Sequence, residues 1–197
     1  MNGPVKIAVL VSHGGTNLQA LIDGAPYENG ELSFVLSSHP DAFALQRAAR
    51  AGIERLVLNP KDYSGRADYT DAVVDALLAK EIGLVVFGGF MFILAPRFAD
   101  VFANRAVNVH PALIPSFCGK GFYGLRVHRA ALDYGVKVTG ATVHFVTAGA
   151  DEGPVISQKA IDVLPGDTPE SLQRRVMEQC ERPLLVEAVR GFCLGAL

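Results

Sequence analysis

Short apolar runs alternate with stretches of helical periodicity along the first half of the chain. Four runs rich in Val, Leu and Ile are expected to be strands: residues 5–11, 32–36, 55–58 and 84–87. Continuous apolar runs of this length are typical of strands that a parallel sheet buries on both faces. Apolar residues at helical spacing lie between these runs, at residues 18–22, 41–51 and 66–79. A strand followed by a helix, repeated in this way, predicts a parallel sheet with right-handed crossovers.

The second half of the chain predicts a different edge for the same sheet. Residues 106–110 alternate between apolar and polar side chains, as a short strand does. Residues 138–146 and 154–163 are two strand-like runs joined by a short loop, which favours an antiparallel hairpin, and a last helix is expected over residues 170–181. We therefore predict a single α/β domain over residues 1–197. It is a Rossmann-like open sheet of mostly parallel strands, with helices on both faces and an antiparallel C-terminal edge.

The composition is that of an ordinary globular protein: half of the 197 residues are apolar, 19% are charged and the net charge is −2. Near-neutral charge and the lack of a Lys/Arg run give no electrostatic reason to expect nucleic acid as a partner. The widely spaced Cys118, Cys180 and Cys193 suggest free thiols in a reducing compartment rather than disulfides or zinc ligands. No run approaches the roughly 18 apolar residues that span a bilayer, and no signal peptide is evident. We therefore expect a cytoplasmic protein that does not enter a membrane.

Asn108 and His110 are the first candidates for chemistry. They lie two residues apart on the strand predicted over residues 106–110, so their side chains project from the same face. Pro111 cannot continue the hydrogen bonding of a strand, which leaves His110 at the strand end. An amide donor beside a titratable imidazole can stabilise an oxyanion and move a proton. Taken alone, an Asn-x-His pair at a strand end is more often part of ordinary loop chemistry.

Asp151 is the third candidate. It follows a strand-like run, residues 142–146, and precedes Gly153-Pro154, which is a turn signal. A carboxylate brought near His110 is expected to favour the cationic imidazole, the form that can donate a proton.

The loop Ser-His-Gly-Gly-Thr-Asn, residues 12–17, is a candidate anion site between the first strand and the first helix. Backbone N–H groups and the helix dipole favour an anion there. Gly14 and Gly15 allow close approach of a ligand, while Thr16 and Asn17 add donors and can cap the helix. The loop is neither G-x-G-x-x-G nor a Walker loop, so a monophosphate fits it better than a dinucleotide. A tight turn without any ligand explains the glycines about equally well.

Three motifs together resemble one family, the folate-dependent formyltransferases. N-V-H-P-A-L-I-P, residues 108–115, resembles the family segment N-[IV]-H-P-S-L-L-P. G-A-T-V-H-F-V, residues 140–146, followed by Asp151, resembles the second half of the same site. V-S-H-G-G-T-N-L-Q-A, residues 11–20, resembles the loop of the branch that formylates glycinamide ribonucleotide. The resemblance covers the chain from about residue 6 to about residue 183.

The resemblance implies an enzyme with the formyltransferase fold that moves a formyl group from 10-formyltetrahydrofolate, its co-substrate, to the amine of glycinamide ribonucleotide. No metal is implied, and the implied partners are these small molecules, with the protein a monomer or a homodimer. Asn108 and His110 would stabilise the oxyanion. His110 would also supply a proton, and Asp151 would keep it cationic for that purpose.

The resemblance also implies which residues bind the substrates. The phosphate of the ribonucleotide is assigned to Gly15, Thr16 and Asn17. The folate is assigned to Arg66, Met91, Phe92, Ile93, Leu94 and Asn108. The ribose is assigned to a Glu of the last helix, where the register leaves Cys180 or Glu181 and the chemistry favours Glu181.

Several positions depart from the family pattern. His13 stands in place of Gly, Phe92 in place of Arg, and Glu152 in place of Gly. Residues 116–124 form a longer loop, which is either a mobile flap beside the site or simply an elongated surface loop.

Other functions fit parts of the sequence. They are a formyltransferase for another amine acceptor, a formyltetrahydrofolate hydrolase, and a non-catalytic Rossmann-like nucleotide-binding module. The binding module would keep the glycine-rich loop but has no use for Asn108, His110 and Asp151 together. The two histidines outside these motifs, His39 and His128, are expected in a turn and on a helix surface.

Overall fold

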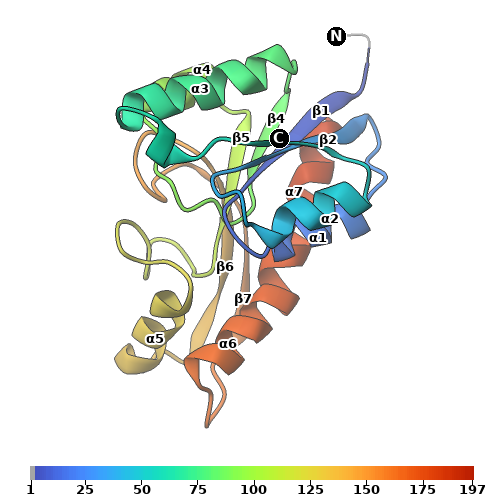
Figure 1. Cartoon of the computed structure of the whole chain (residues 1–197). Helices are drawn as coiled ribbons and strands as arrows, with labels where there is room; N and C mark the ends of the chain where they lie inside the picture. Colours follow the sequence, from blue (N-terminus) through green and yellow to red (C-terminus); the bar gives the residue numbers. More distant parts are fainter. Residues whose placement is uncertain (1–2) are drawn as a thin grey trace.

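A sheet of seven strands, in the order β3-β2-β1-β4-β5-β6-β7, forms the middle layer of the computed structural model, which describes residues 3–197 (Figure 1). The strands are β1 (Val5–Val11), β2 (Gly30–Ser37), β3 (Glu54–Val57), β4 (Leu84–Phe87), β5 (Ala106–His110), β6 (Val138–Phe145) and β7 (Val155–Asp162). All pairings among β1 to β5 are parallel, whereas β6 pairs antiparallel with both β5 and β7. The predicted open sheet with an antiparallel C-terminal edge is confirmed. Residues 1–2 of the predicted domain lie outside the described residues.

Helices cover both faces of this sheet (Figure 1). One face shares a core with α1 (Thr16–Asp23), α2 (Phe43–Arg50), α6 (Pro169–Val176) and α7 (Arg182–Cys193). The other face shares a core with α3 (Arg66–Ala79) and α4 (Pro96–Val101), and α5 (Leu125–Tyr134) packs beside α6. A 3-10 turn, η1 (Pro60–Asp62), and a π-helical turn, η2 (Met177–Glu181), complete the elements. Within residues 3–197 no helix is long and apolar enough to cross a membrane.

β1 illustrates why the apolar runs become central strands. All residues from Ile7 to Val11 are fully buried, and they alternate between the two cores. Successive side chains of a strand point to opposite faces, so a strand covered on both faces has to be apolar at every position. Burial of apolar surface contributes about 25 cal/mol per Å². The uninterrupted run therefore places β1 in the middle of the sheet.

The helix ends differ from the sequence-based expectation. Neither Thr16 nor Asn17 caps α1: its N-cap is Gly15, in a left-handed conformation with φ 67°, and no side chain caps the helix. A Cβ atom on Gly15 would lie 2.6 Å from the Cβ of Ala44, so close packing of α2 also demands glycine there. The last helix does not end at Glu181.

Helical backbone continues from α6 through η2 into α7. Pro183 does not break this path because it lies in the first turn of α7, where proline is tolerated. The sequence patterns also do not predict the short α4 or the α5 helix.

His128 lies inside the protein and not on a helix surface as expected. Its side chain is fully buried in α5, and neither ring nitrogen has a hydrogen-bond partner among residues 3–197. Burial, and secondarily the charge of His110, lowers the pKa of His128 to about 4. Removing an imidazole from water disfavours its charged form, so His128 is neutral when the protein is folded at neutral pH.

This buried histidine predicts a loss of stability in mild acid that a His128→Leu variant should not share. The pKa of His128 is about 4 in the folded protein against an ordinary 6.5. Below pH 6.5 this histidine is protonated in the unfolded chain but stays neutral in the folded chain. The free energy of unfolding therefore falls as the pH drops. For this group the loss between pH 7 and pH 5 is about 2 kcal/mol. Urea unfolding at the two pH values measures it, and equal losses in the wild type and the variant would contradict the assignment.

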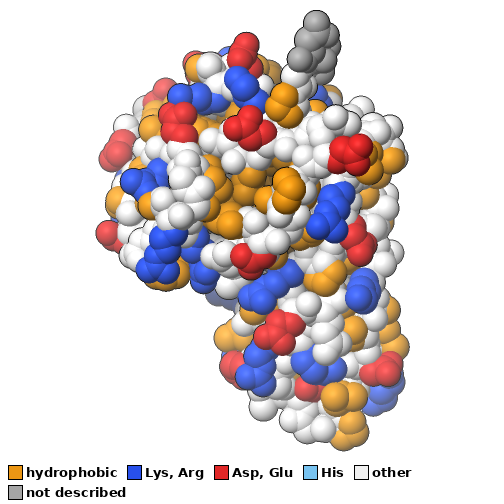
Figure 2. Space-filling model, turned by 90° about the vertical axis from the view of Figure 1, so that its right-hand side faces the viewer, with side chains coloured by type: hydrophobic (Ala, Val, Ile, Leu, Met, Phe, Trp, Pro, Cys, Tyr) orange, Lys and Arg blue, Asp and Glu red, His pale blue; other side chains and the backbone are white. Residues whose placement is uncertain are grey.

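The surface carries charges of both signs. On the face seen in Figure 2, Lys and Arg side chains are interspersed with Asp and Glu side chains, and hydrophobic side chains gather in its upper half. The lower, narrower part of the molecule contains α5, α6 and the far ends of β6 and β7 (Figure 1).

Candidate functional site

β5 carries Asn108 and His110 to the junction between the parallel and antiparallel halves of the sheet. Asn108 pairs with Phe87 of β4 on one side and with His144 of β6 on the other, and His110 pairs with Thr142. Both residues lie toward the carboxyl end of β5, the end at which open α/β sheets bind ligands. His110 is buried and Asn108 is half-buried, so a ligand reaching them would be largely withdrawn from water.

Asp151 lies against both of these side chains. Its Oδ2 is 3.4 Å from Nδ1 of His110, and its Oδ1 accepts a hydrogen bond of 3.4 Å from the amide of Asn108. Its Oδ1 is also 3.6 Å from Nε2 of His144, and the backbone N–H of Gly119 donates to Oδ2 at 2.9 Å. Burial raises the pKa of Asp151. The hydrogen bond with His144, the charge of His110 and the Gly119 N–H lower it by more, so the pKa of Asp151 is below its ordinary value. The carboxylate is therefore ionised at neutral pH.

Both ring nitrogens of His110 face an acceptor. Its Nε2 lies 2.9 Å from the carbonyl oxygen of Phe117, which can only accept, and its Nδ1 faces the Asp151 carboxylate. A proton on either ring nitrogen therefore has a hydrogen-bond acceptor. His144 differs, because its Nδ1 donates to the carbonyl of Phe145 at 2.8 Å and its Nε2 lies 3.2 Å from the Asn108 amide.

Thr142 holds the loop that follows His110. Its hydroxyl is fully buried, donates to the carbonyl of Ala112 at 2.7 Å and accepts from the N–H of Ile114 at 3.1 Å. Gln158 on β7 reaches over to the same hydroxyl at 2.9 Å and to the Ile114 carbonyl at 3.0 Å. The loop is thus tied to β6 and β7 immediately beside His110.

The longer loop over residues 116–124 lies on the candidate site. The Phe117 carbonyl and the Gly119 N–H, described above, contact His110 and Asp151. Phe117 itself adopts φ 49°, a left-handed conformation that is uncommon for a bulky residue. The loop therefore takes part in the site geometry, and the expectation that it is only an elongated surface loop is wrong for this structure.

An apolar pocket opens beside Asn108 and Asp151. Of the residues predicted to bind folate, Phe92, Ile93, Leu94 and Asn108 line this pocket, together with Phe87, Phe90, Ala95, Phe98, Ala99, His144, Val146, Thr147, Gly149, Ala150 and Asp151. Met91 is not among the lining residues, and its backbone N–H bonds the hydroxyl of Ser12 at 2.9 Å. Arg66 lies at the margin, where its guanidinium donates to the Leu94 carbonyl at 3.0 Å. An apolar lining that contains a few polar groups suits a heteroaromatic ring.

The glycine-rich loop lies on the other side of Ser12, at the start of α1. Arg47 of α2 donates to the Gly14 carbonyl at 2.9 Å and to the Gln19 side chain at 2.8 Å, which holds the loop in place. The uncapped helix start leaves backbone N–H groups without a side-chain partner, as in an anion site. Sequence patterns give no sign of Arg47, because its contact depends on how α2 packs on α1.

Glu181 lies next to this helix start. Both Cys180 and Glu181 are buried on η2, but the Glu181 carboxylate shares a hydrogen bond with Asn17 of the loop. Burial raises the pKa of Glu181 to about 7, opposed by Asn17 and by the charge of Arg182. Of the two registers left open by the sequence, Glu181 is the one that brings a carboxylate to the loop. π-helical turns are frequent at functional sites.

The amino-acid sequence of the chain is similar to that of several formyltransferases. A family model described as formyl transferase matches residues 5–189. A phosphoribosylglycinamide formyltransferase from Haemophilus influenzae is 36% identical over 194 residues, which cover 98% of this chain and 89% of that protein. The trifunctional purine biosynthetic protein adenosine-3 of Drosophila melanogaster is 39% identical over 175 residues, 87% of this chain, but the chain spans only 13% of that protein.

Solved structures agree with these sequence matches. The crystal structure of glycinamide ribonucleotide transformylase 1 from Symbiobacterium toebii matches with a TM-score of 0.90 and 42% identity, covering 99% of this chain and 90% of the other. A structure of the phosphoribosylglycinamide formyltransferase from Brucella melitensis matches with a TM-score of 0.88 and 36% identity, covering 98% of each chain.

Proposed function

The chain belongs to the formyl transferase family, and we propose that it transfers the formyl group of 10-formyltetrahydrofolate to the amine of glycinamide ribonucleotide, a step of de novo purine biosynthesis. The observation that carries this proposal is the convergence of Asn108, His110 and Asp151 beside an apolar pocket that Asn108 and Asp151 line. The Ser12 hydroxyl of the glycine-rich loop accepts a hydrogen bond from the backbone N–H of Met91, which directly precedes the pocket residues Phe92, Ile93 and Leu94. The glycine-rich loop and the pocket segment are therefore connected through Ser12.

The pocket fits a reduced folate. Three phenylalanines line it, and Phe87 contacts both Phe90 and Phe98 edge to face, so they offer an apolar wall for a pterin ring. Asn108 and Asp151 line the same pocket and supply polar groups. Bound there, 10-formyltetrahydrofolate supplies an activated formyl group next to His110.

The chain's own residues then perform the transfer. Asn108 and the His110 imidazolium donate hydrogen bonds to the formyl oxygen as negative charge develops on it during amine attack, and for this the Nε2–H of His110 exchanges the Phe117 carbonyl for the formyl oxygen. His110 gives its proton toward the folate nitrogen that leaves when the old C–N bond breaks, directly or through a water. The attacking amine forms the new C–N bond and releases its own proton to solvent. Asp151 stabilises the imidazolium throughout, because its pKa keeps it ionised.

Binding both substrates in one cleft supplies the remaining rate enhancement. The phosphate is proposed to bind at Gly15, Thr16 and Asn17, and the ribose at Glu181, which shares a hydrogen bond with Asn17. Holding the amine close to the formyl carbon turns a bimolecular reaction into an effectively unimolecular one. No nucleophilic Ser, Cys or Lys side chain is required for this direct attack.

A spectroscopic assay tests the proposal. We expect consumption of 10-formyltetrahydrofolate by the wild-type protein only when glycinamide ribonucleotide is present. Consumption without an acceptor would identify a hydrolase instead. Consumption that requires a different amine would identify a formyltransferase for another acceptor, and no consumption by the folded protein under any condition would reject the proposal.

A further inference from the structure

Gln158 is an exposed residue of β7, the last strand of the sheet, and its side chain reaches back over β6. It pairs with Thr142 of β6, and Thr142 pairs with His110 of β5. Residues that face one another on neighbouring strands project from the same side of a sheet. His110, Thr142 and Gln158 therefore form a row across three strands, with the proposed acid at one end and an exposed amide at the other.

The hydroxyl of Thr142 has no free hydrogen-bonding position. It is fully buried and donates its proton to the Ala112 carbonyl at 2.7 Å. Its oxygen accepts from the N–H of Ile114 at 3.1 Å and from Nε2 of Gln158 at 2.9 Å. A hydroxyl has one donor and two acceptor positions, so these three bonds use them all. Nε2 of Gln158 also donates to the Ile114 carbonyl at 3.0 Å, so both backbone polar groups of Ile114 are held.

Ile114 lies immediately before the longer loop that covers the candidate site. Phe117 and Gly119 follow it by three and five residues. The Phe117 carbonyl lies 2.9 Å from Nε2 of His110, and the Gly119 N–H donates to Asp151 at 2.9 Å. A displacement of Ile114 would therefore be passed to both contacts, because so few residues separate them from it.

The sheet itself does not depend on the Gln158 side chain. β7 pairs with β6 along its length, from Asp162 opposite Val138 to Val155 opposite His144. An exposed side chain at the edge of a sheet usually contributes little to stability. The two hydrogen bonds of the Gln158 amide therefore have their main consequence at the loop and not in the pairing of the strands.

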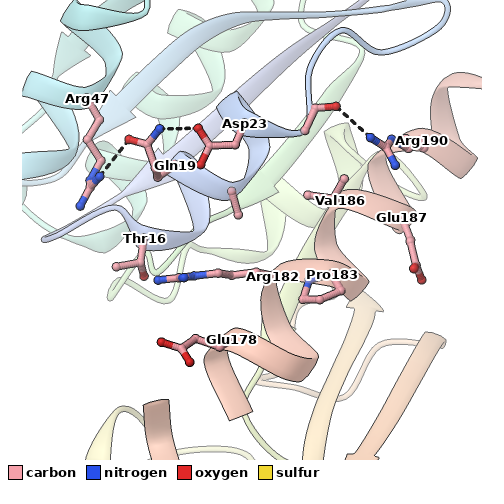
Figure 3. Close-up of a pocket in the computed structure, with 12 residues that line it drawn as sticks. Thr16, Gln19, Asp23, Arg47, Glu178, Arg182, Pro183, Val186, Glu187 and Arg190 are labelled. Carbon is pink, nitrogen blue, oxygen red and sulfur yellow. Dashed lines mark hydrogen bonds between the residues drawn. The ribbon is translucent and has the colours of Figure 1, made fainter. Parts of the chain in front are cut away.

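Both cavities described by the structure lie apart from this network. One, of about 470 Å³, lies between α1, α2 and the start of α7, and its wall contains none of Ala112, Ile114, Thr142 and Gln158 (Figure 3). The apolar pocket is likewise lined by none of them. A change of the Gln158 amide should therefore leave the contacts with either substrate in place.

We propose that Gln158 is a positioning residue for formyl transfer, because it holds Ile114 and thereby the loop that contacts the catalytic side chains. This inference rests on the proposed function and deepens it. When the folate binds, His110 exchanges its contact with the loop for the formyl oxygen, while the Gly119 N–H keeps its hydrogen bond to Asp151. Without the Gln158 amide the loop holds Asp151 less firmly against His110. Misplacement of a catalytic group by about 1 Å can cost on the order of 100-fold in rate.

Two substitutions of Gln158 test the proposal. Gln158→Leu has a similar size but no donor, and Gln158→Glu keeps the shape but presents a carboxylate to the same acceptors. Both should lower kcat by roughly 10- to 100-fold and leave both KM values within a few-fold of the wild type. Agreement between the two variants excludes an effect of the added charge. Gln46→Glu, on the exposed side of α2, is the matched control and should keep the wild-type kcat.

Nitrogen-15 NMR of the His110 ring, recorded without substrates, separates positioning from general stability. The ring signal is assigned by its absence in His110→Ala. We expect it to shift in both Gln158 variants, because Nε2 loses a well-placed carbonyl acceptor, and to stay unchanged in Gln46→Glu. The thermal unfolding midpoints should stay close to that of the wild type.

Three results would overturn the role of Gln158. They are a wild-type kcat in Gln158→Leu, an unchanged His110 signal in both variants, and a loss of kcat that only matches a loss of folded protein. A wild type that transfers no formyl group, but whose His110 signal responds to Gln158→Leu, would reject the proposed function. It would leave the positioning of the loop by Gln158 standing.

Discussion

His110→Ala should lower kcat by roughly 10²- to 10⁴-fold while leaving the KM values for both substrates within a few-fold of the wild type. The variant removes the proton donor and one of the two hydrogen-bond donors proposed for the formyl oxygen. The apolar pocket and the glycine-rich loop, which are proposed to bind the two substrates, remain. The folate-consumption assay under saturating and limiting substrate measures the two parameters.

Two controls accompany this variant. Circular dichroism and thermal unfolding establish that the loss of a buried imidazole has not unfolded the protein, since His110 is only 4% exposed. Added imidazole should restore part of the rate, because it can supply the missing proton through the vacated space. A folded His110→Ala protein with wild-type turnover would exclude His110 as the acid.

Asp151→Asn should lower kcat by on the order of 10²-fold at pH 7.5, with a smaller deficit at lower pH. The carboxylate stands 3.4 Å from Nδ1 of His110 and favours the imidazolium, whereas a neutral amide does not. At lower pH the solvent protonates the imidazole without that help, so the wild type and the variant should converge. A pH profile of kcat for both proteins measures this.

Asp133→Asn is the matched control, because Asp133 lies exposed on α5 and its change also removes one negative charge. Its pH profile should follow the wild type. A constant deficit of Asp151→Asn at every pH would mean that Asp151 acts by holding the site geometry, through Gly119 and Asn108, and not through the charge of His110.

Much of the fold was predictable because its signals are local. The uninterrupted apolar run of β1 and the exact bounds of α3 and β5 follow from side-chain periodicity over a few residues. The same periodicity placed Asn108 and His110 on one face of one strand, and the glycines at 14 and 15 indicated a special turn. The helices α4, α5 and α7 were not predicted. Of these, α4 is only six residues long, and α7 continues past a proline that only its packing shows to be harmless.

By itself, the sequence determined the order of the seven strands along the chain, the shared face of Asn108 and His110, and the special turn at Gly14 and Gly15. The tertiary structure decided which distant groups meet. Pairing of β5 with β6 brings Asp151 to His110 across about forty residues, and packing of α7 near α1 brings Arg182 toward Thr16 across the length of the chain. It also decided that His128 is buried. Periodicity depends on residues that are close together in the sequence. Contacts between distant residues depend on the order of strands in the sheet and on which helices pack together, and neither leaves a local pattern.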